Sequence, residues 1–322
     1  MNDVFIDKKN SATIKGLLIL LIVLGHNHVL CPNTVEHGIM GYLYLFHIAG
    51  FFILPFFYDI PSDTSWKCIS AKIIRTWIPY FWICILCWIA YSVKKHNFII
   101  NIELVINFLR GTQTPIRESF GFVFPWFLPT FCSFSILLLY ARKYKHLYIS
   151  LSLTAFILWG LSWENFFVLK NAVPFGVVLA ISYFGSGVLA FEFNRRFKYS
   201  RYFALLLFIL MSMCYWKNIE IGYMYQLFPV AFFMSLLLVV PYINFGFIRL
   251  LGNNSLGIYL YHMFFVNITY MLFPKTTIMG IVSFFISLFA SLGINMLIYR
   301  IHTLRILLYP KNIDEIKTIF LK

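Results

Sequence analysis

Hydrophobic residues fill most of this chain in ten runs, which short polar or charged breaks separate. The runs cover residues 14–30, 38–57, 74–93, 122–140, 147–162, 172–191, 202–216, 223–243, 256–273 and 277–299. A helix needs about 20 mostly apolar residues to cross a bilayer, and about 17 suffice. The pattern therefore predicts an all-α, polytopic transmembrane helical bundle of about ten spans.

The composition agrees with a membrane protein. Hydrophobic residues make up 61% of the chain and charged residues only 12%, and the mean hydropathy is +0.80. A soluble domain would have about 25% charged residues. Because no proline-rich or serine-rich linker divides the chain, we expect a single transmembrane domain over residues 1–322 in an inner or plasma membrane.

The basic residues predict an orientation. If the N-terminus is cytoplasmic, all but seven of the 26 lysines and arginines fall in the inner segments. The seven outer ones are Lys94, Lys95, Arg110, Arg117, Lys170, Lys217 and Lys275. The positive-inside rule then places both termini in the cytoplasm. The net charge of +14 is spread over several short segments, which argues against a nucleic-acid partner.

A titratable ring lies in the first apolar run. His26 follows Lys15 by eleven residues, which is about three helical turns, so both would share one helix face. An ionisable residue inside a membrane is by default a candidate for function. The alternative is structural: His26 would hydrogen-bond a neighbouring helix, and Lys15 would extend its ammonium group to the membrane edge.

Two more histidines lie inside apolar runs, His47 in the second and His262 in the ninth. The loop between the first two runs is short, so their helices should be antiparallel neighbours, and His26 and His47 could face a common cavity. Glu36 in that loop could orient an imidazole or take a hydroxyl proton. The alternatives are a solvated acid for Glu36 and structural hydrogen bonds for His47 and His262.

Lys72 lies just before the third run and Arg75 lies near its start. The two residues are three positions apart, so they share a helix face and could clamp phosphates. Lys15 would join them at the same membrane edge, and the three cations could hold an anionic cofactor whose flexible arm reaches His26. Ordinary positive-inside anchoring is the alternative. Cys84 and Cys87 lie in an apolar run and indicate buried side chains, and no metal is expected.

Lys15, ten residues and His26 together resemble the Arg/Lys-x10-His motif in the first span of the acyltransferase-3 family of integral membrane acyltransferases. Further segments resemble family segments in the family order, from residue 15 to residue 262. They are residues 46–52 around His47, the basic segment 75–80, the Trp-Phe-Leu segment that contains Trp126, and the late segment 255–262 that ends at His262.

The resemblance implies an enzyme that moves an acyl group, usually acetyl, from cytoplasmic acyl-CoA to a hydroxyl of an extracytoplasmic glycan or lipid-linked sugar. It carries functional roles to Lys15, His26, Lys72 and Arg75. Trp126 and His262 would line the substrate path, and His47 and Glu36 would assist His26. Lys72 stands where the family has arginine, so one bidentate phosphate contact is lost.

An exporter of polysaccharide or lipid-linked glycan is the alternative function, with the histidines lining a permeation path. The sequence shows no pair of matching hydrophobic halves that glycine or proline interrupts, which inverted-repeat transporters often have. Dependence on acyl-CoA would separate an enzyme from an exporter.

Overall fold

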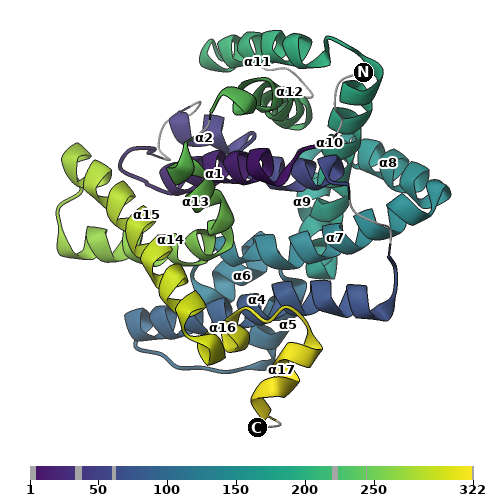
Figure 1. Ribbon diagram of the computed structural model, residues 1–322. Coiled ribbons are helices and arrows are strands. Elements are labelled where there is room, and N and C mark those ends of the chain that lie inside the picture. The colour runs from purple at the N-terminus through teal and green to yellow at the C-terminus, as the bar shows by residue number, and fades with distance from the viewer. Residues whose placement is uncertain (1–4, 33–37, 60–62, 220–223, 244, 321–322) are drawn as a thin grey trace. The chain divides into compact units, whose positions relative to one another are not determined.

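The structure is a computed structural model that describes residues 5–32, 38–59, 63–219, 224–243 and 245–320. Every regular element among these residues is a helix, and none is a strand (Figure 1). The predicted all-α class is therefore confirmed. The backbone divides into two compact units, residues 1–60 with 186–297 and residues 61–185 with 298–322.

The first unit contains the N-terminal helix and most of the C-terminal half of the chain. α1 begins after Asp7, whose carboxylate accepts a hydrogen bond from the Asn10 amide, and it ends at His26. The helices are α1 (Lys8–Gly25), α2 (Ile39–Tyr44), α3 (Ala49–Ile53), η1 (Leu54–Phe57), the second half of α10 (Val177–Arg196), α11 (Ser200–Trp216), α12 (Met224–Val239), η4 (Val240–Tyr242), α13 (Gly246–Asn253), α14 (Ser255–Leu272) and most of α15 (Thr277–Arg300).

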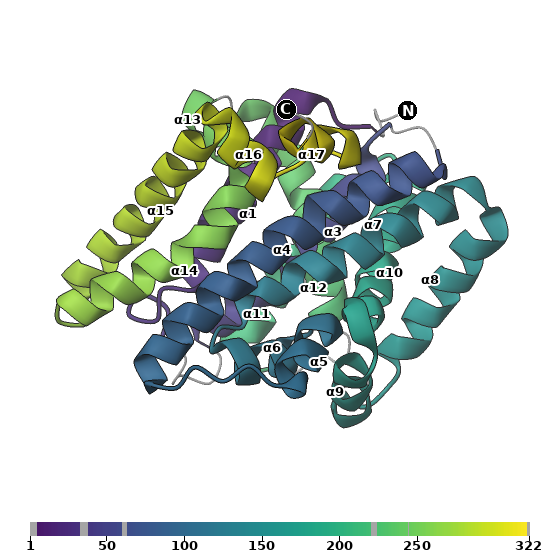
Figure 2. The same cartoon turned by 90° about the horizontal axis from the view of Figure 1, so that it is seen from below.

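The second unit is built on a long helix, α4 (Trp66–Lys95), which Ser65 caps and α7 packs against. The chain leaves α4 through His96, which has a left-handed backbone conformation (φ 52°). The other elements are α5 (Ile102–Arg110), α6 (Gln113–Phe120), η2 (Phe124–Trp126), α7 (Phe127–Lys143), α8 (Lys145–Trp159), α9 (Trp163–Ala172), η3 (Pro174–Gly176), the first half of α10, α16 (His302–Leu308) and α17 (Ile313–Phe320), and Figure 2 shows α16 and α17 beside α4.

All ten predicted runs contain helix, although the structure supports fewer membrane spans directly. Five helical segments in the described part of the chain are long and apolar enough to cross a membrane. They are Ile39–Phe57, Trp66–Lys95, Phe124–Lys143, Pro174–Arg196 and Thr277–Arg300. The second run differs from a regular helix, because turns at residues 45–48 separate α2 from α3.

Aromatic packing holds this break in place. Phe46 is buried beside the turn, and its ring centroid lies 4.1 Å from that of Phe232 and 5.6 Å from that of Phe228. Buried aromatic pairs of this kind stabilise a core beyond the area that they remove from solvent. The packing fixes the backbone position of the next residue, His47.

α1 and α13 meet through glycines. A methyl group at Gly16 would lie 2.0 Å from the Ile248 carbonyl oxygen, and one at Gly252 would lie 1.8 Å from the Ala12 carbonyl oxygen. Only a residue without Cβ permits this approach, because backbone atoms cannot move aside as a flexible side chain can. The N-terminal half of α1 is thereby held close to α13.

We predict that Gly252→Ala lowers the free energy of unfolding by about 1–3 kcal/mol, because the added methyl group overpacks the contact between α1 and α13. Thermal unfolding of the detergent-purified protein measures the change. Gly293→Ala on α15 is the control, since a methyl group there meets nothing within 4 Å and alanine favours the helix. Equal melting temperatures for Gly252→Ala and the parent would contradict the close approach.

Candidate active site

Three histidines from separate elements of the first unit form a histidine cluster, His26, His47 and His262. His26 terminates α1, His47 lies in the turn between α2 and α3, and His262 lies on α14. His26 Nδ1 is 3.0 Å from His262 Nε2, and the ring centroids of His26 and His47 are 6.4 Å apart. His47 and His262 are fully buried, whereas His26 is partly exposed. His26 is therefore the most accessible of the three rings.

Hydrogen bonds on the far side of His262 determine which nitrogens carry protons. Its Nδ1 lies 2.8 Å from the Tyr259 carbonyl oxygen and 3.2 Å from that of Ile258. A carbonyl can only accept, so Nδ1 carries the hydrogen, and Nε2 of the neutral ring keeps a lone pair. His262 Nε2 must then accept from His26 Nδ1–H. This assignment leaves His26 Nε2 with a free lone pair, which is the form of a general base.

His47 is fixed in the same tautomer. Its Nδ1 donates to the Leu43 carbonyl oxygen at 2.5 Å, one helical turn earlier in the chain. Its Nε2 is buried and has no hydrogen-bond partner among the described residues. A buried acceptor without a partner costs about 1–3 kcal/mol, so this atom is available to a bound hydroxyl group or to water.

Asn27 anchors the end of α1, and the sequence analysis did not select it. The side chain is fully buried, and its Nδ2 donates to the Gly280 carbonyl oxygen at 2.8 Å. Its Oδ1 accepts from the Leu30 amide at 3.1 Å and from the Tyr270 hydroxyl. These bonds connect the residue after His26 to α14 and α15. A polar amide inside the first apolar run was the signal that could have found it.

Tyr44 is a second residue that the sequence analysis missed. Its ring lies edge-on to both His26 and His47, with centroid distances of 5.7 Å and 4.8 Å. Tyr44 is 42% exposed, so it forms the partly open side of the histidine cluster. With 20 tyrosines in the chain, nothing in the sequence pattern distinguished this one.

Lys15 and Glu36 are the other two predicted site residues before residue 60, and their outcomes differ. Lys15 lies on α1, the helix that ends at His26, and it is partly buried. Among the described residues, none forms a hydrogen bond or an ion pair with the Lys15 ammonium group. Glu36 lies outside the residues that the structure describes, so its assignment to the site stays a prediction.

Lys72, Arg75 and Trp126 belong to the second unit. Lys72 is partly buried on α4, within electrostatic range of Arg75 and Arg142. Arg75 is exposed, and its Nε donates to the Lys311 carbonyl oxygen at 2.8 Å. Trp126 is buried in η2, before α7. Because these residues and the histidine cluster lie in different units, a joint site with Lys15 and His26 stays a prediction.

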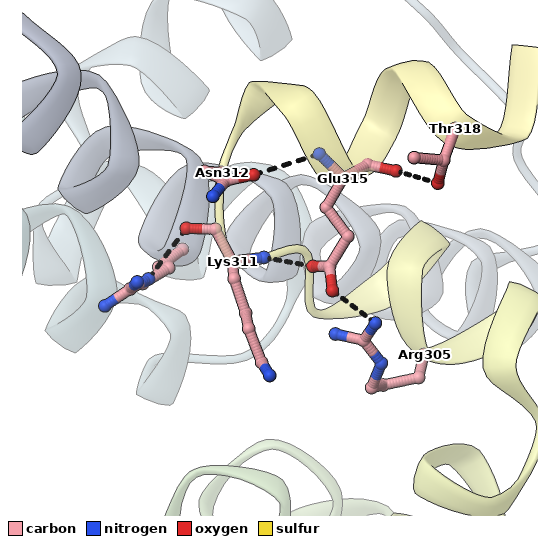
Figure 3. Close-up of polar contacts among 6 residues, drawn as sticks. Arg305, Lys311, Asn312, Glu315 and Thr318 are labelled. Atoms are coloured by element: carbon pink, nitrogen blue, oxygen red, sulfur yellow. Dashed lines mark hydrogen bonds and ion pairs between the residues drawn. The ribbon is translucent and has the colours of Figure 1, made fainter. Parts of the chain in front are cut away.

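A network of polar contacts surrounds the Lys311 backbone (Figure 3). One carboxylate oxygen of Glu315 accepts from the Lys311 amide at 2.7 Å, and the other pairs with Arg305. Asn312 Oδ1 accepts from the Glu315 amide at 2.9 Å and so caps the first turn of α17. The Arg305 guanidinium beside the Glu315 carboxylate holds the pKa of that carboxyl below its usual range.

Comparison with known proteins identifies the family. The family model of an acyltransferase domain matches residues 9–300, and the match runs through both units. The chain belongs to the acyltransferase-3 family, and this membership supports membrane acyltransferase activity. No curated protein and no solved structure matches the chain.

We predict that the contribution of Glu315 to stability depends on pH. Because its pKa is lowered in the folded protein, the contribution is complete above the unfolded pKa of about 4.3 and is lost as the pH falls through the folded value. The difference in melting temperature between the parent and Glu315→Gln should be constant above about pH 5 and shrink below about pH 4. Asp314→Asn, at an exposed acid of the same turn, is the control, and a difference that does not change with pH would contradict the prediction.

Proposed function

We propose that this protein is an integral membrane O-acetyltransferase in which His26 acts as general base. It would move an acetyl group from cytoplasmic acetyl-CoA to a hydroxyl of an extracytoplasmic or lipid-linked glycan. The observation that carries the proposal is the hydrogen bond between His26 Nδ1 and His262 Nε2, because it leaves His26 Nε2 as a proton acceptor at the accessible face of the cluster.

In the proposed reaction, His26 Nε2 removes the proton from the acceptor hydroxyl as its oxygen attacks the thioester carbonyl. The tetrahedral intermediate then collapses, the carbon–sulfur bond breaks, and the imidazolium returns the proton to the CoA thiolate. The products are the acetyl ester and CoA, and His26 returns to its neutral form. A covalent route would use the same Nε2 as nucleophile and form an acyl-histidine before the ester.

The partners of His26 suit this proton transfer. When His26 takes the proton, its Nδ1–H bond to His262 becomes a charge-assisted hydrogen bond, which is stronger than the bond between neutral rings. His262 thus acts through His26, as the third member of a catalytic triad does. The unpartnered Nε2 of His47 would accept a hydrogen bond from a hydroxyl of the acceptor sugar.

The donor would bind at the cytoplasmic side. In the proposed topology of about ten spans with both termini inside, Lys15, Lys72 and Arg75 lie at the cytoplasmic membrane edge and hold the CoA phosphates. Arg75 can form a bidentate contact with a phosphate, whereas Lys72 acts as a point charge. Trp126 would line the path of the acyl chain. Family membership gives the exporter alternative no support.

We predict that His26→Ala reduces acetyl transfer by at least about 100-fold, because general-base catalysis contributes about 10²–10⁴-fold to such rates. Transfer of radiolabel from acetyl-CoA to glycan, in membranes with equal amounts of protein, measures the loss. His28→Ala, at an exposed histidine two residues away, should retain activity. Equal labelling by the parent and His26→Ala would remove His26 from the mechanism.

We also predict a graded effect at His262. His262→Leu removes the acceptor for His26 Nδ1–H and should lower kcat about 10–100-fold with little change in the KM for acetyl-CoA, since misplacing a catalytic group by about 1 Å can cost 100-fold. His262→Gln offers an amide oxygen near the position of Nε2 and should recover part of the rate. Equal activities for the two variants would argue for a purely structural His262.

A further inference from the structure

The chain continues beyond the family match into a C-terminal segment, residues 302–320, that contains α16 and α17. This segment packs on α4. Two side chains of α4 donate hydrogen bonds to its backbone, Trp82 Nε1 to the Leu307 carbonyl oxygen at 3.0 Å and Arg75 Nε to that of Lys311 at 2.8 Å. Residues 75 and 82 are about two helical turns apart and share a face of α4, so the segment is bound to that face at two points.

Glu315 fixes the turn from which the Lys311 carbonyl projects. The carboxylate binds the Lys311 amide and Arg305, while Asn312 binds the Glu315 amide. The Thr318 hydroxyl closes the network by donating to the Glu315 carbonyl oxygen at 2.7 Å (Figure 3). The arrangement resembles a capping box in which the acidic side chain reaches one residue further back. The turn at residues 311–315 is therefore held by side chains as well as by its backbone.

The bond to Lys311 has a direct consequence for Arg75. The carbonyl occupies Nε, and neither Nη1 nor Nη2 has a hydrogen-bond partner among the described residues. These terminal nitrogens form a planar fork that matches two oxygens of a phosphate. An exposed arginine without such a support would lose side-chain entropy when it binds a ligand, and the carbonyl reduces that loss.

We propose that Glu315 is a positioning residue for donor binding, which it serves by holding the Lys311 carbonyl against Arg75 so that the Arg75 fork meets a phosphate of the acyl donor. The identity of this donor as acyl-CoA rests on the proposed function. Lys72, one turn earlier on α4, adds a second positive charge near the same phosphate. Residues outside the family match thus set the affinity for the donor.

The test is calorimetric titration of the full-length protein, in phosphatidylcholine nanodiscs, with CoA itself. Arg75→Ala should weaken CoA binding about tenfold or more, and Glu315→Ala about fivefold, since bidentate charged contacts with phosphate are strong. The double variant should bind no more weakly than Arg75→Ala alone, because Glu315 acts through Arg75. Asp314→Asn should bind as the parent does, and Glu315→Gln, which can still accept from the Lys311 amide, should retain most of the affinity.

Additive losses in the double variant, or unchanged binding by Glu315→Ala, would overturn the proposal. If Glu315→Ala does not elute as a monodisperse protein, Trp82→Phe replaces it, because this change removes the hydrogen bond from α4 to the Leu307 carbonyl oxygen and leaves all charges in place. Trp82→Phe should weaken CoA binding only while Arg75 is present, and a loss that persists in Arg75→Ala would also overturn the proposal.

Two further measurements identify the ligand and separate this inference from the proposed function. Pantetheine, which lacks the nucleotide phosphates, should bind equally to the parent and to Arg75→Ala. If Arg75→Ala instead weakens binding to phosphatidylglycerol vesicles and leaves CoA binding unchanged, the site binds a lipid headgroup and the proposal fails. If CoA affinity depends on Glu315 through Arg75 but the protein transfers no acetyl group, only the proposed function is refuted. If acetyl transfer depends on His26 but the affinity for CoA does not depend on Glu315, only this inference is refuted.

Discussion

The end of α1 at His26 is the constraint on which the histidine cluster depends. An imidazole can act as a base only if one nitrogen keeps a lone pair at a reachable position, and here the bond to His262 Nε2 selects that nitrogen. The next residue, Asn27, ties the same backbone to α14 and α15. The glycine contact with α13 holds the N-terminal half of α1. Position and protonation of His26 thus follow from the same packing.

The two units contribute different chemistry. The first holds the histidine cluster, in which only neutral groups touch one another, as burial requires of rings without a counter-charge. The second holds Lys72 within electrostatic range of Arg75 and Arg142, and none of the three side chains is fully buried, so each can keep its charge in contact with water. The neutral rings and the charged side chains therefore occupy different environments, each suited to its own electrostatics.

In the C-terminal segment, partly buried polar side chains fix a turn. Glu315, Lys311 and Arg305 lie within eleven positions of one another, and each bond between them is local. The contact with Arg75 spans 236 positions and depends on the local network, because only a fixed turn presents its carbonyl in one direction. A local cap is in this way converted into a tertiary restraint.

The sequence by itself determined the helical class, the membrane character and the family, because runs of apolar residues and the spacing of Lys15 and His26 are properties of the chain order. It also placed His26, His47 and His262 among the candidates, since polar rings inside apolar runs stand out. Only the tertiary structure decided that His262 contacts His26, that Asn27 anchors the end of α1, that Tyr44 lies beside the cluster, and that Lys311 supports Arg75. These residues lie far from their partners in the sequence, or they are of types that occur throughout the chain. Hydrogen bonds between distant segments leave no periodic pattern in the sequence.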